Sequence, residues 1–465
     1  MSWLVPLSLS LGTAFSVLLP VLRPIGWELI LSSGAFLMWA LIAFRYPTSF
    51  SLTRFAPMSI FLLTHTLMIV LPSLYIRMQS PELGTDTFFV AVVGVVPLST
   101  VGWWAVVRGT GMNRDQFGDY FRSSTELVLS RTALVLWFGL VGLCLALAVL
   151  HLAVVPEYPL KALLSGASPM DLALMREASF KTLPIPGIKY LLSWLLAVLF
   201  PFALVWTLCR AVLVEGWKWK LTFVPLLSIA LVYATFTLAK APAAMLVGIL
   251  FIAYFAVHGR RVPILMMVLG SLSILAIPAL LVTMISDAGP TATLMGLARR
   301  LFLVPAEALV FYFEAFDGEQ PFLHGRSISL VAKFLDNDTP FPTANYIYHI
   351  IHPGGLTTGL SNASFVGSMW ADFSYIGVIA GPLFVGCLIA LSELVISSGR
   401  KDVFKVGLHA IVALQVFFLS SRSVTVAMLT GGWGLAIFLA LSIGILLRQL
   451  NRSPRIVAPA LDAEG

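Results

Sequence analysis

The feature that most constrains this chain is the recurrence of long apolar runs along almost its whole length. Each run has roughly 20 residues, which in an α-helix is enough to cross a bilayer core about 30 Å thick. Charged residues make up 11% of the chain, whereas a soluble domain carries about 25%. The sequence therefore predicts an all-α polytopic membrane protein, because a helix satisfies its own backbone groups in lipid.

We expect about twelve transmembrane helices, all within a single transmembrane domain of residues 1–450. A short polar tail, 451–465, follows and is expected to lack a fixed structure. The expected spans are 3–22, 25–44, 56–76, 87–107, 128–155, 190–214, 221–239, 242–257, 263–285, 373–398, 403–420 and 425–447.

Basic residues are distributed unevenly between the two sets of connections. If the N-terminus is cytoplasmic, the connections on the cytoplasmic side hold most of the arginines and lysines, as the positive-inside rule requires. The sequence therefore predicts a multi-pass membrane protein with both termini, and the tail, in the cytoplasm. In a bacterium the membrane would be the inner membrane and the opposite side the periplasm. The formal net charge of +7 reflects this orientation and the anionic lipid, and does not indicate nucleic acid.

Two connections on the opposite, periplasmic side are long. The larger covers residues 286–372 and the smaller covers 156–189. A group of cations lies on this side, where the positive-inside rule disfavours them. They are Arg176, Lys181, Lys240, Arg299, Arg300, Arg326 and Arg422. Such cations either snorkel to the outer headgroups or bind an anion, and a guanidinium fork matches phosphate oxygens well.

Two segments of the larger loop place arginines in a suggestive context. The segment 294–316 is expected to form a surface helix kinked at Pro305, with Arg299 and Arg300 as anion ligands or as interfacial anchors. In Gly325-Arg326-Ser327 the glycine allows close backbone approach to an anion, and Ser327 adds a hydroxyl donor. The alternative for this tripeptide is an ordinary loop turn.

Histidines supply candidates for a general base, because histidine titrates near neutral pH. His349 and His352 are three residues apart and share a face of any helix that contains them. Their alternative is a structural role, and the acidic candidates for the same task are Asp336, Asp338, Glu307 and Asp372. No third ligand stands at zinc-motif spacing, so neither a metal nor another cofactor is expected.

Four stretches together resemble the Wzy-type oligosaccharide repeat-unit polymerases, such as the O-antigen and enterobacterial common antigen polymerases. These stretches are 299–305, the aromatic segment 312–316, the segment 321–327, and Asn362-Ala363-Ser364-Phe365 leading to Asp372. The resemblance implies a fold like that of C-type glycosyltransferases and a metal-independent reaction. The substrates would be glycans on undecaprenyl diphosphate, as donor and acceptor, at the periplasmic face.

This resemblance, together with the position of the cations, leads to roles for individual residues. The expected diphosphate ligands are Arg299, Arg300, Arg326, Lys240 and Arg422. His352, His349 and Asp372 are the candidates for the catalytic base. Further substrate contacts are expected from Lys181, Arg176, Ser327, Asn362 and Tyr312. Membrane lipid is an expected partner, and a chain-length regulator and a flippase are candidate protein partners.

Two other classes of function stay open. An O-antigen-ligase-like transferase would move a finished glycan to another acceptor. A flippase or other carrier of lipid-linked oligosaccharide would need ionisable groups near the middle of the membrane. The clear candidate for such a group is His65, which makes a carrier the weaker alternative.

Overall fold

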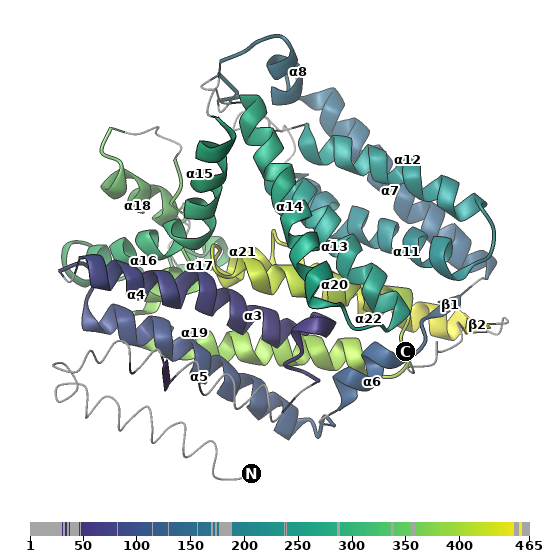
Figure 1. Ribbon diagram of the computed structural model, residues 1–465, viewed down its shortest axis with the longest axis horizontal. Helices are drawn as coiled ribbons and strands as arrows, with labels where there is room; N and C mark the ends of the chain where they lie inside the picture. Colours follow the sequence, from purple (N-terminus) through teal and green to yellow (C-terminus); the bar gives the residue numbers. More distant parts are fainter. Residues whose placement is uncertain are drawn as a thin grey trace.

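The computed structural model is built almost entirely of α-helices (Figure 1). It describes residues 30, 33–34, 37, 46, 48–80, 82–113, 115–128, 130–155, 157–168, 171–172, 174–175, 188–236, 238, 240–285, 289–335, 339–354, 359–361, 363–450 and 455–457.

Among these residues, 7 helices are long and apolar enough to cross a membrane. They are Pro57–Gln79, Asp86–Gly109, Arg131–Val154, Tyr190–Leu213, Ala241–His258, Phe365–Ser397 and Val424–Leu446. Their length and composition are consistent with an all-α membrane protein. The expected spans 3–22 and 25–44 lie almost wholly outside the described residues, and so does the expected site residue Asn362.

Each expected span beyond residue 50 corresponds to one helix or to consecutive helical segments. The segments before residue 260 are α3 (Pro57–His65), η3 (Thr66–Val70), α4 (Leu71–Gln79), α5 (Asp86–Gly109), α7 (Arg131–Val154), α10 (Ile188–Trp194), η4 (Leu195–Leu199), α11 (Phe200–Leu213), α12 (Lys218–Thr235) and α13 (Lys240–His258). Those after it are α14 (Ile264–Ile285), α19 (Phe365–Ser397), α20 (Val403–Phe418), α21 (Val424–Met428) and α22 (Trp433–Leu450). Side-chain caps from Thr85, Ser130, Asp402 and Ser423 begin α5, α7, α20 and α21.

Helices α5 and α19 pack backbone against backbone. A Cβ atom added to Gly102 would lie 2.0 Å from the carbonyl oxygen of Leu383, and one added to Gly386 would lie 1.9 Å from that of Ser99. The two backbones therefore touch, and only glycine leaves room for this contact.

This pair also defines two ends of the bundle. Just before α5, the Gly84 amide donates to Glu314 of α16 (3.2 Å), and just after α5, Gln116 donates to Ser397 at the end of α19 (3.1 Å). We call these the α18 end, on the left of Figure 1, and the α6 end, at its lower right.

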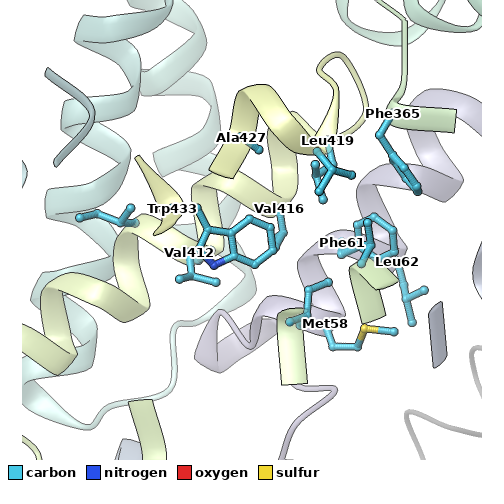
Figure 2. Close-up of a cluster of buried hydrophobic side chains, with 14 of the residues drawn as sticks. Met58, Phe61, Leu62, Phe365, Val412, Val416, Leu419, Ala427 and Trp433 are labelled. Atoms are coloured by element: carbon cyan, nitrogen blue, oxygen red, sulfur yellow. The ribbon is translucent and has the colours of Figure 1, made fainter. Parts of the chain in front are cut away.

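The core is centred on α20, whose side chains are almost all buried. Figure 2 shows Val412 and Val416 of α20 among Met58 and Phe61 of α3 and Trp433 of α22. The indole of Trp433 donates to the hydroxyl of Ser392 on α19 at 2.9 Å. Burial of this apolar surface contributes about 25 cal/mol per Å² to stability, and it fixes the helices around α20.

The α18 end carries a cap of shorter helices. They are α15 (Pro290–Phe302), α16 (Val304–Glu314), η5 (Ala315–Glu319), α17 (Ser329–Leu335) and α18 (Thr343–Ile351). The described part of the expected loop 286–372 is thus largely helical, and α19 begins within it at Phe365. Of the expected loop 156–189, the structure describes α8 (Pro159–Leu164).

The α6 end is closed by short elements. These are η2 (Leu52–Arg54), α6 (Gln116–Arg122) and an antiparallel pair of strands, β1 (Glu126–Val128) and β2 (Arg455–Val457). The expectation that the tail lacks structure is wrong for β2. Its backbone finds hydrogen-bond partners on β1, which the amino-acid pattern of the tail alone does not reveal.

Candidate functional site

A break in helix α19 organises the α18 end. Ser374 has φ 54° and ψ −139°, whereas the backbone on both sides of it is helical. A Cβ atom on Gly377 would lie 2.0 Å from the carbonyl oxygen of Met369, although residues eight apart in a straight helix are about 12 Å apart. The first turns of α19 therefore fold back onto the part that follows. The expected span 373–398 begins at this break.

The break leaves backbone carbonyls without hydrogen-bond partners in their own helix. A turn at residues 323–327 supplies the missing donors. The amide of Leu323 donates to the carbonyl of Ala371 (2.9 Å), and that of His324 donates to the carbonyl of Asp372 (2.8 Å). Non-helical backbone near membrane-spanning segments persists where such groups are satisfied by protein.

Asp372 adds the side-chain half of this junction. One carboxylate oxygen accepts the Ser327 amide at 3.1 Å, and the other accepts the Ser327 hydroxyl through a short hydrogen bond. Asp372 is 1% exposed. The sequence-predicted residues Ser327 and Asp372 are therefore brought together, with the carboxylate holding the turn.

The 323–327 turn has an unusual backbone. His324 has φ 50° and Gly325 has φ 88°, so two successive residues are left-handed. For His324 and Ser374 this costs about 1 kcal/mol or more each, and such outliers gather at functional sites. Arg326 follows directly, with an exposed side chain and a carbonyl that accepts the Phe341 amide at 3.0 Å.

Helix α15 presents the other arginine pair. Arg299 and Arg300 are both exposed in its last turn, where cations are favoured by the helix dipole. Arg299 lies 3.2 Å from Glu307, and Arg300 has no acidic partner among the residues that the structure describes. Because the Arg299 pair is exposed, it contributes little to stability and leaves the guanidinium accessible.

Arg422 lies in a turn between two helices, and Lys240 is the first residue of a helix. The α20–α21 turn holds Arg422, whose half-buried guanidinium lies 4.4 Å from the Phe418 ring, and burial lowers its pKa. Leu419, in the same turn, accepts the Phe365 amide at 3.1 Å, which places this turn at the start of α19. Lys240 begins α13, whose other end lies at α6, since Thr125 donates to the Val257 carbonyl at 3.1 Å.

The two histidines lie at the end of α18. His349 is half-buried, and His352 is exposed and caps the helix through its amide, which donates to Tyr348. Both rings contact the Tyr348 ring, with centroids at 5.6 Å and 4.9 Å. They are thus accessible from outside the cap.

Tyr312 lies in the core of the cap and is 4% exposed. Its hydroxyl lies 3.5 Å from the Ser361 carbonyl, and burial together with the Asp372 charge raises its pKa above the usual range. The substrate contact expected from Tyr312 stays a prediction. Arg176 and Lys181 lie outside the described residues.

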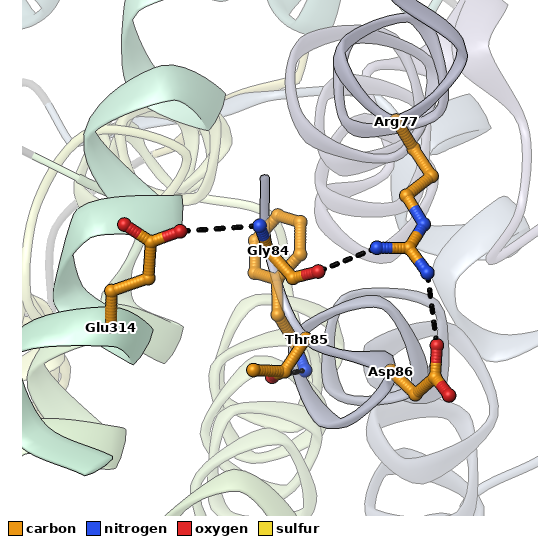
Figure 3. Close-up of polar contacts among 6 residues, drawn as sticks. Arg77, Gly84, Thr85, Asp86 and Glu314 are labelled. Carbon is orange, nitrogen blue, oxygen red and sulfur yellow. Dashed lines mark hydrogen bonds and ion pairs between the residues drawn. The ribbon is translucent and has the colours of Figure 1, made fainter. Parts of the chain in front are cut away.

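A polar junction that the sequence analysis did not anticipate ties the cap to the long helices (Figure 3). Arg77 of α4 donates to the Gly84 carbonyl at 2.6 Å and pairs with Asp86 of α5 at 3.1 Å. Glu314 of α16 accepts the Gly84 amide. In the sequence, only the pairing of Arg77 with Asp86 across a Gly-containing turn could indicate this junction. The contact of Gly84 with Glu314 cannot be predicted from local pattern, because the two residues are 230 positions apart.

No group of histidine, cysteine and acidic residues that would hold a metal ion occurs in the described part of the chain. Neither a protein-family model, nor a curated protein, nor a solved structure matches this chain.

Proposed function

We propose that this protein is a glycosyltransferase that polymerises undecaprenyl-diphosphate-linked repeat units at the periplasmic face of the bacterial inner membrane. The observation that carries the proposal is the junction at Ser374. The turn that exposes Arg326 is held by four hydrogen bonds to Ala371 and Asp372, in the cap that also exposes Arg299 and Arg300. Such cations suit a substrate whose phosphates sit at the membrane surface and whose tail lies in lipid.

In the proposed reaction, a hydroxyl oxygen of the acceptor glycan attacks the anomeric carbon of the donor. The bond from this carbon to the diphosphate oxygen breaks, and undecaprenyl diphosphate leaves with the electron pair. The arginines stabilise the negative charge that develops on the departing oxygen. The acceptor proton passes to a general base, for which His352 and His349 are the candidates because both are accessible.

Asp372 takes a different role in this proposal from that of a base. Both of its oxygens accept hydrogen bonds from Ser327, and the side chain is buried. We therefore infer that Asp372 positions the turn that carries Arg326.

The test is chain extension by purified protein in detergent with synthetic lipid-linked repeat units. Growth of polymer with release of undecaprenyl diphosphate supports the proposal. Transfer of preformed chains to another acceptor, without extension, would indicate a ligase. A protein that carries out neither reaction but moves the lipid across vesicles would be a carrier. The base assignment is tested separately, because replacing His349 and His352 together by alanine should abolish extension.

A further inference from the structure

The α6 end contains a buried arginine that the proposed reaction does not use. Arg54 lies in η2 and is 4% exposed. Its Nη1 atom is fully buried and has no hydrogen-bond partner among the described residues. A buried guanidinium nitrogen without a partner is costly, and each such group in a folded protein requires an explanation.

Contacts from three segments hold Arg54 in this position. The carbonyl of Thr53 accepts the Val262 amide at 2.8 Å, and His409 Nε2 lies 3.0 Å from the carbonyl of Phe55. On α6, a Cβ atom added to Gly118 would lie 2.7 Å from Nη1, so this glycine makes room for the guanidinium. The site is therefore built by the fold and does not depend on one flexible side chain.

Two further arginines, Arg122 and Arg261, lie near Arg54. Arg261, in the α13–α14 connection, directly precedes Val262, whose amide donates to Thr53, and Arg122 ends α6. Burial lowers the pKa of Arg54, and the charges of Arg261 and Arg122 lower it further. Asp115 and Asp119 act in the opposite direction, but both are exposed, and Asp119 is already paired with Arg122 at 2.6 Å. Three guanidinium groups thus meet two solvent-screened carboxylates, which leaves an excess of positive charge.

An exposed apolar surface adjoins these charges. Ile264 and Leu265, which begin α14 three and four residues after Arg261, are 74% and 68% exposed. In a helix long enough to enter a membrane, such residues face acyl chains. An anionic lipid has a phosphate group and a hydrocarbon tail. The cationic cluster complements the phosphate, and the adjoining apolar surface complements the tail.

We propose that Arg54, Arg122 and Arg261 bind the phosphate group of an anionic phospholipid whose acyl chain lies along Ile264 and Leu265. The planar guanidinium forks suit phosphate oxygens, and the ligand offsets the excess positive charge of the three arginines. The site lies at the opposite end of α5 from the Ser374 junction and is distinct from the proposed catalytic site.

The experiment measures the melting temperature of the purified full-length protein in detergent, with added phosphatidylglycerol, phosphatidylcholine or inorganic phosphate. We expect phosphatidylglycerol to raise the melting temperature of the wild type. Arg261→Gln should raise the half-saturating lipid concentration about tenfold, since a hydrogen bond to a charged group contributes about 1.5 kcal/mol. Arg54→Gln should do the same or more.

Arg108→Gln is the matched control, because Arg108 is an exposed arginine at the same end of α5. Because Arg261 is exposed, Arg261→Gln still tests the lipid site if Arg54→Gln does not fold. The same lipid dependence in Arg261→Gln and Arg108→Gln would overturn the site. An equal stabilisation by inorganic phosphate or by phosphatidylcholine would overturn the anionic lipid as its ligand.

Discussion

At the α18 end, Arg299, Arg300 and Arg326 are exposed and the carboxylate of Asp372 is buried, whereas at the α6 end Arg54 is buried and Asp119 is exposed. The buried cations of the α6 end also include Lys401 and Lys405, which are 1% and 4% exposed. Both ends are rich in basic residues, so composition does not separate them. The two ends differ in the sign of the charged groups that are buried: a carboxylate at the α18 end and cations at the α6 end.

Lys401 shows what a buried cation does at the α6 end. Its Nζ donates to the carbonyls of Phe121 at 2.9 Å and Ser123 at 3.0 Å, at the end of α6. Carbonyls at a helix C-terminus lack partners in the helix, and a lysine there satisfies them and complements the dipole. Such a cation holds the fold together, whereas Arg299 and Arg300 of the α18 end are exposed to solvent.

The largest expected effect concerns the exposed arginines. Arg326→Ala should lower the rate of chain extension about 100-fold, because each preorganised donor contributes roughly 2.7–4 kcal/mol to the transition state. Arg108→Ala, at the α6 end, should leave the rate unchanged. Single-turnover rates with synthetic lipid-linked repeat units measure both. Equal losses in the two variants would mean that the two ends do not differ in function.

The next effect concerns the fold-back of α19. Gly377→Ala should destabilise the protein by about 3 kcal/mol, because the new Cβ atom would lie 2.0 Å from the Met369 carbonyl oxygen. Gly139→Ala in α7 is the control, since no atom lies within 4 Å of its added Cβ and alanine favours a helix. Thermal unfolding in detergent compares the two. A neutral Gly377→Ala would show that the two parts of α19 do not touch.

A smaller effect separates the roles of Asp372. Asp372→Ala should lower the free energy of opening the 323–327 turn by about 2 kcal/mol. Hydrogen exchange at the Leu323 and His324 amides should then be about 30-fold faster. Asp372→Asn should leave exchange slow, because its amide group can accept from the Ser327 N–H and donate to the hydroxyl. Hydrogen exchange read by mass spectrometry gives the result without reference to activity. An Asp372→Asn protein with a closed turn and no activity would identify Asp372 as a base.

The smallest effect is a pH dependence at the α6 end. Burial lowers the pKa of Lys401 to about 7, although Cys209 acts in the opposite direction. Between this value and the higher pKa of an unfolded lysine, the unfolded chain binds more protons, so stability rises with pH. The gain is at most about 1.4 kcal/mol per pH unit from about pH 7 upward.

Unfolding of the wild type and of Lys401→Met, measured from pH 6 to 9, isolates this contribution as the difference between the two curves. We expect the difference to change above pH 7 and to be constant below it. Parallel curves over the whole range would show that Lys401 does not titrate in the folded protein.

Much of the helical frame can be predicted from local pattern. Runs of apolar residues place α5, α7 and α13 within a few residues, because hydropathy over about 20 positions needs no knowledge of neighbours. The candidate site is harder. Arg326, Ser327 and Asp372 attract notice as polar residues in an apolar chain, but the 45-residue separation of Ser327 and Asp372 conceals their hydrogen bonds.

By itself, the amino-acid sequence determined that this protein is a set of apolar helices with basic residues gathered in particular connections. Only the tertiary structure decided that α19 breaks at Ser374, that Asp372 holds the turn before Arg326, and that Arg54 is withdrawn from water. The physical reason is that hydropathy is a sum over neighbouring residues. Burial, backbone strain and the pairing of charges depend on segments that meet only after the chain has folded.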